Sequence, residues 1–312
     1  MNADSPATDS LLRFWQPRYW PLWIGLAMLR LLVLLPWPLQ RLAGRGLGWL
    51  AWVALPGRRA VAATNLRLCF PDLDAPARNR LLRQHFASLD MQLIEVGLTW
   101  WASDVTVRRL VKVEGLEHFE AATRNGKGAI VLSAHFAPVE IAARAVRLTH
   151  PQIAGLYRAN RNPMVDAVLR RARTGITPTL IPKESMRTMI RSLTRGTSVW
   201  YAADQSYRRQ YSVLVPFCGE PAMTNAALTH IARIAGASVV PLVAHRLADG
   251  SGYRLRFEPA LEDFPTGDPT ADALRVNAII ERWIREAPHE YYWIHRRFKG
   301  RPQGYPDPYA SR

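Results

Sequence analysis

Cysteine and lysine are scarce in this sequence, and several familiar motifs are missing from it. Its 312 residues include 2 cysteines, which excludes a disulfide-stapled scaffold and a cysteine-rich zinc module. Only 4 of the 41 Lys and Arg residues are lysines, so arginine carries the positive charge. Internal repeats and long low-complexity linkers are also missing, which excludes a solenoid.

Acidic residues are few as well. With 25 Asp and Glu the formal net charge is +16, while 48% of the chain is hydrophobic and 11 residues are tryptophan. A chain this apolar can bury a core, so a disordered polyelectrolyte is excluded. The charge implies an anionic partner: nucleic acid, an anionic membrane, a phosphorylated substrate or an acidic carrier protein. No zinc spacing, aromatic RNA-binding signature or basic heptad region is present, so we expect no nucleic-acid partner.

One apolar run lies near the N-terminus. Residues 19–35 form 17 positions with a single charge, Arg30, and a shorter apolar patch follows at 47–55. A spanning helix needs about 20 apolar residues, with roughly 17 as the lower limit. The run therefore suits a spanning helix, an interfacial helix or a buried core helix. Tryptophans and arginines gather at its edges, as interfacial anchors do, so we predict a membrane anchor.

This anchor sets the predicted organisation of the chain. Residues 1–56 form a polar, frayed tail and the anchor, and residues 57–312 form the main domain. A cleavable signal peptide fits poorly, because Asp4 and Asp9 precede the run. More arginines follow the run than precede it, so the main domain is expected on the cytoplasmic face of the membrane. Its arginine surplus then meets anionic lipid head groups.

The rest of the chain alternates short apolar runs with helical periodicity. An α/β fold is predicted, with a mostly parallel or mixed sheet flanked by helices. The expected strands are 128–133, 153–157, 179–182, 198–202, 238–245 and 253–258. The expected helices are 77–101, 162–173, 184–194, 223–235, 272–286 and one that begins at Pro138.

The residues that indicate chemistry follow the first of these strands. His135 lies at the carboxyl end, where ligands bind in such folds, and Glu140 is the third residue of the next helix. A carboxylate on one imidazole nitrogen stabilises the imidazolium and leaves the other nitrogen free to take a hydroxyl proton. With no serine or cysteine nucleophile beside it, this pair suits direct attack by a substrate hydroxyl. A helix-capping glutamate and a structural loop histidine are the alternatives.

The segment VLSAHFAPVEIAARAV resembles the His-x4-Asp/Glu box of glycerolipid-type acyltransferases. Its glutamate form is typical of the bacterial lipid A late acyltransferases, the lauroyl and myristoyl transferases. The segments YRANRNP (157–163), 203–246 and YYWIHRRFK (291–299) are similar to further blocks of that family, in the same order. The resemblance covers roughly 60–300. Where related glycerophosphate acyltransferases carry Glu-Gly-Thr-Arg, this chain reads CGEPAMTN, which weakens a glycerophosphate reading.

The resemblance implies a glycerolipid acyltransferase-like fold and acyl transfer from acyl carrier protein to a hydroxyl of a lipid A precursor at the cell inner membrane. No metal or other cofactor is then required. His135 is expected as the base, and Glu140 as the residue that orients it. Backbone N–H groups near Pro138 and Val139 are the expected oxyanion donors.

Substrate-binding roles are expected for Arg158, Asn160 and Asp204. For Arg158 the alternative is a surface ion pair, for Asn160 a turn former and for Asp204 a cap or turn residue. Residues 295–299 form a basic patch that suits the acidic carrier, lipid phosphates or the membrane surface. Two further hypotheses stay open: the same transfer to another glycolipid, aminolipid or lysophospholipid, and a non-catalytic basic protein that binds membranes.

Overall fold

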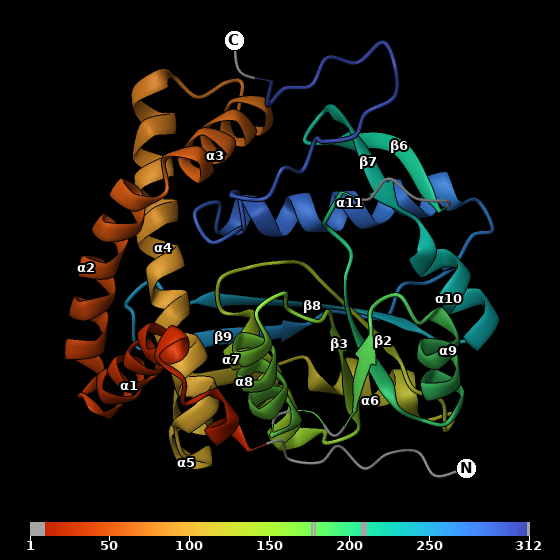
Figure 1. Ribbon diagram of the computed structural model, residues 1–312. Coiled ribbons are helices and arrows are strands. Elements are labelled where there is room, and N and C mark those ends of the chain that lie inside the picture. The colour runs from red at the N-terminus through yellow and green to blue at the C-terminus, as the bar shows by residue number, and fades with distance from the viewer. Residues whose placement is uncertain (1–9, 176, 178, 207–210, 311–312) are drawn as a thin grey trace.

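A seven-stranded sheet forms the centre of the computed structural model, which describes residues 10–175, 177, 179–206 and 211–310 (Figure 1). Its strands, in spatial order, are β1 (Val111–Glu114), β9 (Tyr253–Phe257), β8 (Val239–Arg246), β2 (Ile130–Ser133), β5 (Ser198–Ala202), β3 (Ile153–Tyr157) and β4 (Leu180–Pro182). Neighbouring strands pair in parallel, except β8 with β9. The predicted α/β fold with a mostly parallel sheet is therefore confirmed.

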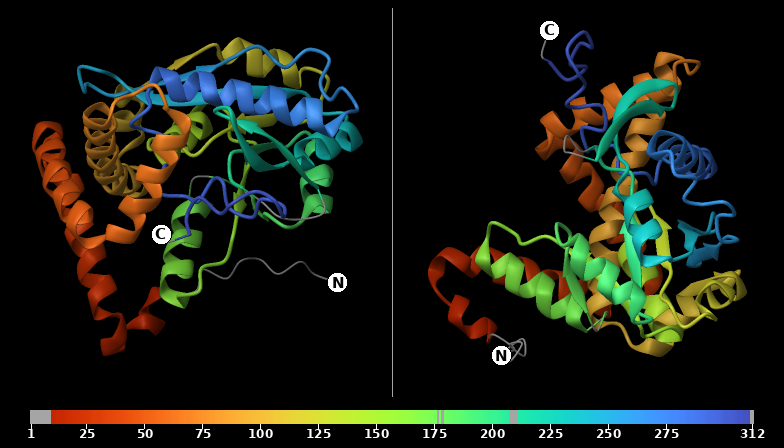
Figure 2. Two further views of the ribbon diagram at one scale, coloured as in Figure 1. Left: turned by 90° about the horizontal axis from the view of Figure 1, so that it is seen from above. Right: turned by 90° about the vertical axis from the view of Figure 1, so that its right-hand side faces the viewer.

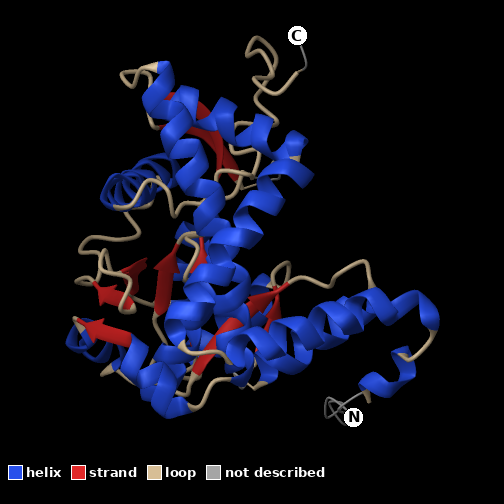
Figure 3. Ribbon diagram, turned by 90° about the vertical axis from the view of Figure 1, so that its left-hand side faces the viewer, coloured by secondary structure: helices blue, strands red, loops and turns tan. Residues whose placement is uncertain are grey.

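Helices cover both faces of this sheet, and strand side chains alternate between two apolar clusters. In β2, Ile130 and Leu132 belong to one cluster while Val131 belongs to the other. This alternation explains why β2 reads as a continuous apolar run, since a strand buried on both faces has no solvent side. The covering helices after α5 are α6 (Leu116–Thr123), α7 (Val139–Thr149), α8 (Pro163–Thr174), α9 (Met186–Thr194), α10 (Ala227–Ala235) and α11 (Pro269–Glu286). In Figure 3, helices of the N-terminal part lie in front of part of the sheet.

The N-terminal part is a helical layer against one edge of the molecule (Figures 1 and 2). It comprises η1 (Leu11–Phe14), η2 (Pro17–Tyr19), α1 (Trp20–Leu34), α2 (Trp37–Ala54), α3 (Pro56–Cys69), α4 (Ala75–Trp101) and α5 (Asp104–Leu110). Helix α4 starts at the cap residue Asp74, whose carboxylate accepts from Ala77 N at 2.6 Å. Helix α1 lies so close to α4 that a Cβ on Gly97 would sit 2.6 Å from Val33 Cγ2. Close packing therefore joins α1 to α4 within this layer.

The predicted anchor region is two helices rather than one. The apolar run forms α1, and Pro36 separates it from α2. Within the described residues, no helix has both the length and the apolar character needed to cross a membrane. The transmembrane form of the anchor thus finds no support, and attachment in the interface stays a prediction, as does the boundary at residue 56. The frayed tail was predicted over 1–10, of which 1–9 lie outside the described residues.

The sequence-based assignment missed a β-hairpin. A helix was expected to begin at residue 223, but β7 (Glu220–Asn225) pairs antiparallel with β6 (Ser212–Phe217), and α10 begins at Ala227. The turn of this hairpin is Cys218–Gly219, with φ of +52° and +80°. Glycine adopts that left-handed conformation freely, whereas cysteine does so rarely. The short strand β1 and helix α6 were missed as well.

Candidate active site

His135 and Asp204 come together at the carboxyl edge of the sheet. Strands β2 and β5 are parallel neighbours, and the register pairs Ser133 with Ala202. Two residues beyond each strand end, the chain places His135 and Asp204 side by side. The imidazole Nδ1 lies 2.6 Å from Asp204 Oδ1, and the backbone N–H of His135 donates to Asp204 Oδ2 at 3.0 Å. The carboxylate thus fixes both the backbone and the ring of the histidine.

The charges of His135 and Asp204 stabilise each other. Burial alone would raise the pKa of Asp204, but the charge and hydrogen bonds of His135 outweigh burial and hold that pKa at about 2. Burial would likewise lower the pKa of His135, and the Asp204 carboxylate reverses this, so the His135 pKa lies above its ordinary value. The imidazolium is therefore the stabilised form, as a base that must accept a proton requires.

The second imidazole nitrogen faces the cavity. The side-chain amide Nε2 of Gln205 lies 3.2 Å from His135 Nε2, and Gln205 lines the cavity together with His135. Asp204 accepts the proton on Nδ1, so the neutral ring presents the lone pair of Nε2. In this tautomer Nε2 accepts the amide proton of Gln205, and it can instead accept a proton from a substrate hydroxyl.

Glu140 does not orient His135, which corrects the expected pairing. The Glu140 carboxylate in the first turn of α7 pairs with Arg173 of α8 at 2.6 Å. The carboxylate on Nδ1 is that of Asp204, which the sequence suggested only as a substrate-binding residue. Strand pairing brings Asp204 to the histidine across 69 positions of chain, a separation that no local spacing reveals. The negative charge of Glu140 nevertheless raises the His135 pKa.

A cavity of about 770 Å³ opens beside this pair. Its walls come from β3 and β5 and from helices α7 to α10, and they include His135, Glu140 and Arg158. Its lining includes apolar residues such as Leu156, Leu169, Leu180, Met186, Met189, Trp200 and Ile231. It also includes charged residues, among them Arg147, Arg158, Arg173, Lys183 and Glu184. The cavity therefore suits a ligand that has a long apolar portion and an anionic portion.

Asn160 lies outside this lining. Its side-chain oxygen accepts from Asn162 N at 2.9 Å, and its own N–H donates to Asp166 at 2.7 Å. Asn162 caps α8 by accepting from Met164 N at 3.0 Å. The structure gives Asn160 the turn role that was the alternative to substrate binding. The predicted oxyanion donor Val139 N is also engaged, since it donates to the carbonyl of Phe136 at 3.2 Å.

The basic patch at 295–299 is only partly a surface patch. Arg297 is buried, donates to Met223 O at 3.0 Å and to Thr224 Oγ1 at 2.8 Å, and lies over the Phe217 ring. Burial and the nearby Lys299 lower the pKa of His295 to about 4, so this histidine is neutral near pH 7. Arg296 and Lys299 are exposed. The expected cationic surface is therefore smaller than the sequence suggested.

A side chain of helix α3 holds the segment that carries this patch. Asn65 of α3 is fully buried and donates to the carbonyls of Trp293 at 2.6 Å and His295 at 2.8 Å. The Tyr309 hydroxyl donates to the Asn65 side-chain oxygen at 2.5 Å. No sequence motif indicated this role, because an asparagine inside a helix has no local signature. In the described part of the chain, no group of three or more His, Cys, Asp or Glu could hold a metal ion.

Comparison with known proteins finds, over most of the chain, the family that the sequence motifs resemble. Residues 8–300 match the sequence model of a family described as bacterial lipid A biosynthesis acyltransferase. The chain is 38% identical over 295 residues to the lipid A biosynthesis palmitoleoyltransferase of Escherichia coli (strain K12), covering 93% of this chain and 95% of that protein. It is 36% identical over 294 residues to the lipid A biosynthesis lauroyltransferase of the same organism, covering 94% and 96%. Both likenesses extend over nearly the whole of each chain.

Proposed function

Because this chain belongs to the bacterial lipid A biosynthesis acyltransferase family, we propose that it transfers a fatty acyl chain to a hydroxyl of a lipid A precursor. The proposed donor is a thioester of acyl carrier protein, and the proposed step is a late, secondary acylation. The observation that carries the proposal is the His135–Asp204 pair beside a cavity with apolar and cationic walls. No metal or other cofactor takes part in the proposed reaction.

The proposed chemistry is a direct transfer. Nε2 of His135 takes the proton of the acceptor hydroxyl as the hydroxyl oxygen attacks the thioester carbonyl. Asp204 stabilises the imidazolium that forms, and the negative charge of Glu140 favours it further. Collapse of the tetrahedral intermediate forms the new ester, breaks the carbon–sulfur bond and returns the proton from His135 to the leaving thiolate. Every proton and electron pair is thus accounted for by one residue and two substrates.

The cavity walls support this choice of substrates. An acyl chain gains free energy when apolar walls remove it from water, at about 0.8 kcal/mol for each buried CH₂. Residues such as Met189, Trp200 and Ile231 offer such walls. Arg158 and Arg147 can bind phosphate groups, either on the acceptor or on the arm of the carrier protein. The net charge of +16 also favours encounter with an acidic carrier protein.

We also propose attachment to the cytoplasmic face of the inner membrane through α1 and α2. Large apolar side chains are exposed on these helices: Ile24, Met28, Leu31, Leu34, Leu42, Trp49, Leu50 and Val53. A patch of this kind marks an interaction surface rather than ordinary solvent-facing surface. Flotation with anionic and neutral vesicles tests the idea. Binding to anionic vesicles that weakens with salt is expected, and recovery in the unbound fraction would contradict it.

The decisive test of function uses the lipid product. Mass spectrometry of lipid A from a deletion strain should show the loss of one acyl chain, restored by the intact gene but not by His135→Ala. An unchanged lipid A profile would favour another acceptor lipid. Full activity of a folded His135→Ala protein would reject the mechanism and favour the non-catalytic, membrane-binding alternative.

A further inference from the structure

The backbone of residues 135–139, which carries the base, has no N–H to offer an oxyanion. Attack on a thioester moves negative charge to the carbonyl oxygen, and hydrogen-bond donors must meet that charge. Four backbone N–H groups of this segment already have acceptors at 2.9 to 3.2 Å, namely Asp204 for His135, Ala134 for Phe136, Glu290 for Ala137 and Phe136 for Val139. The remaining residue, Pro138, has no N–H. In this segment, therefore, the donor has to come from elsewhere.

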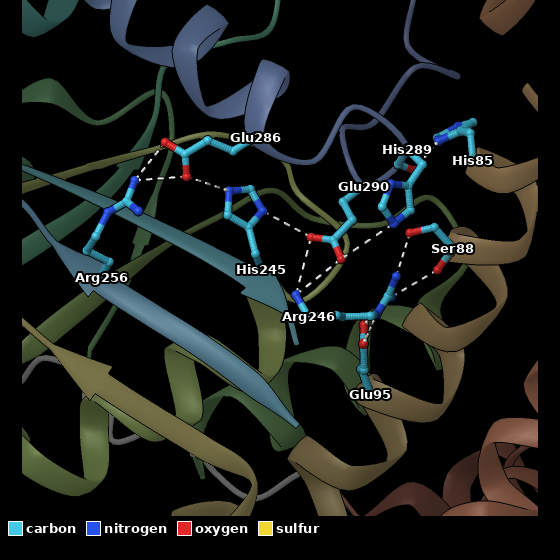
Figure 4. Close-up of polar contacts among 9 residues, drawn as sticks. All are labelled: His85, Ser88, Glu95, His245, Arg246, Arg256, Glu286, His289 and Glu290. Carbon is cyan, nitrogen blue, oxygen red and sulfur yellow. Dashed lines mark hydrogen bonds and ion pairs between the residues drawn. The ribbon is translucent and has the colours of Figure 1, made fainter. Parts of the chain in front are cut away.

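Residues 290–292 hold the same segment in place. Phe136 forms an antiparallel bridge with Tyr291, and Tyr292 N donates to His135 O at 3.0 Å. The Glu290 carboxylate accepts from Arg246 N at 3.1 Å, and the Arg246 guanidinium pairs with Glu95 of α4 (Figure 4). The backbone around the base is thus tied to β8 and to α4. We expect it to keep its orientation when a substrate binds, so none of its N–H groups turns toward the carbonyl.

The side chain of Gln205 lies where the donor is needed. Its amide Nε2 is 3.2 Å from His135 Nε2, the nitrogen that takes the hydroxyl proton, and Gln205 lines the cavity together with His135. An acceptor hydroxyl that binds His135 Nε2 at about 2.8 Å takes the place of this amide. The oxyanion forms on the very carbon that the hydroxyl attacks. The displaced amide N–H groups therefore need only a short rotation to reach it.

The neighbours of Gln205 fix its backbone. Asp204 is buried and accepts two hydrogen bonds from His135. Ser206 is buried as well, and its hydroxyl donates to Lys299 O at 3.0 Å. Gln205 itself is only half-buried and extends into the cavity wall. Its amide can therefore rotate about a backbone whose distance from the base is set on both sides.

We propose that Gln205 is a catalytic residue: the acceptor hydroxyl displaces its side-chain amide from His135 Nε2, and the amide then donates a hydrogen bond to the thioester carbonyl oxygen as this oxygen becomes an oxyanion. The inference rests on the proposed function, in which His135 is the base. As the new carbon–oxygen bond forms, the hydroxyl proton moves to His135 and the carbonyl π electrons move to oxygen. Collapse restores the carbonyl, and the leaving thiolate takes the proton from His135. Gln205 exchanges no proton in either step.

A neutral amide suits this position better than a charged side chain. Lys183 and Arg158 also line the cavity, but a cation in contact with His135 Nε2 would oppose protonation of the ring. The amide donates two N–H groups without adding charge. It can thus stabilise the oxyanion while the imidazolium forms beside it.

The first test compares Gln205→Met with the parent protein, using lauroyl acyl carrier protein and a phosphorylated lipid A precursor as probes. Methionine has a similar length and no donor. We expect kcat to fall by about 10²-fold with little change in KM for either substrate, as for the loss of one oxyanion donor. Gln152→Met is the matched control, because Gln152 is exposed and lies outside the cavity lining. It should match the parent protein.

A second donor substrate separates an oxyanion contact from a structural role. In a dithioester of lauroyl acyl carrier protein, sulfur replaces the carbonyl oxygen, and sulfur accepts hydrogen bonds only weakly. The fall in kcat caused by Gln205→Met should therefore be smaller with the dithioester than with the thioester. An equal fall with both donors would mean that the substitution disturbs the site in general, and it would overturn the inference.

A folded Gln205→Met protein with the kcat of the parent, or one whose loss lies in KM alone, would also overturn the inference. If this variant does not fold, Gln205→Glu keeps the size of the side chain and replaces the N–H groups by oxygen. Its kcat should fall at least as far, and a parent-like kcat would contradict the role. His135→Ala separates the two ideas. Full turnover there removes the proposed function itself, whereas an inactive His135→Ala with an unaffected Gln205→Met removes only the role of Gln205.

Discussion

Asp204→Asn is the substitution that most directly tests the pairing with His135. The Asp204 pKa of about 2, against its ordinary 3.8, corresponds to ~2 kcal/mol in favour of the ionised carboxylate. The His135 side chain is 36% exposed, so water screens part of this interaction. We estimate that ~1 kcal/mol acts on the imidazolium, so the His135 pKa should be lower in the variant than in the parent protein.

Two consequences are measurable in the acyl transfer assay. The acid limb of the pH profile of kcat/KM should move to lower pH, because a histidine with a lower pKa stays unprotonated to lower pH. The plateau should fall by about 10²-fold or more, since the amide can also hydrogen bond to the wrong tautomer of the base. An acid limb that stays in place, with the plateau intact, would show that Asp204 does not act on His135.

Stability gives an independent check of the same pair. The raised His135 pKa stabilises the fold at pH values below the ordinary histidine pKa. This contribution is lost as the pH rises through the pKa that His135 has in the folded protein. The lowered Asp204 pKa contributes stability above 3.8, which is lost as the pH falls toward 2. The pair should thus stabilise the fold most between about pH 4 and 6.5. Urea unfolding should find Asp204→Asn more destabilising at pH 5.5 than at pH 9, and equal losses would contradict this account.

Three further predictions concern packing and the cavity. Glu95→Ala removes the carboxylate partner of the Arg246 guanidinium, which is 16% exposed and keeps its hydrogen bonds to Ser88, and should cost about 3 kcal/mol of unfolding free energy in urea. Leu93→Ala on the exposed side of α4 should change it little. Gly97→Ala places a Cβ against Val33 and should destabilise the fold by about 1–3 kcal/mol. Gly25→Ala, with open space around the new Cβ, should leave stability unchanged or raise it. Thermal unfolding of both variants tests the difference. Arg158→Met should raise KM for the phosphorylated acceptor with little loss of kcat, if it binds a phosphate, and an unchanged KM would argue against that role.

The sequence predicted those features of the fold that depend on residues close together in the chain. The apolar run of β2 and the positions of His135 and Pro138 follow from residues within about ten positions of one another. The predicted end of α10 at Ala235 is confirmed, because Gly236 follows it in the left-handed conformation that ends a helix. Each of these features depends on neighbours in the chain, which is why sequence reasoning reached them.

The rest depends on contacts between distant residues. The spacing of His135 and Glu140 suggested a pair, but strand order brings Asp204 to the histidine and α8 brings Arg173 to Glu140. The β6–β7 hairpin was missed because its turn contains a cysteine at positive φ, where Asn or Asp would have given a signal.

The fully buried Asn65 has a consequence for shortening the chain. It is the side chain through which α3 holds the carbonyls of Trp293 and His295, next to Tyr292, whose N–H donates to His135 O at 3.0 Å. A truncation that removes α1 and α2 would expose parts of α4 yet leave this attachment in place. A truncation that also removes α3 would release the segment around Trp293 at a point close to the base. The shortest fragment with an intact catalytic centre should therefore begin at or before Pro56, even though nothing in α3 reaches the substrate cavity.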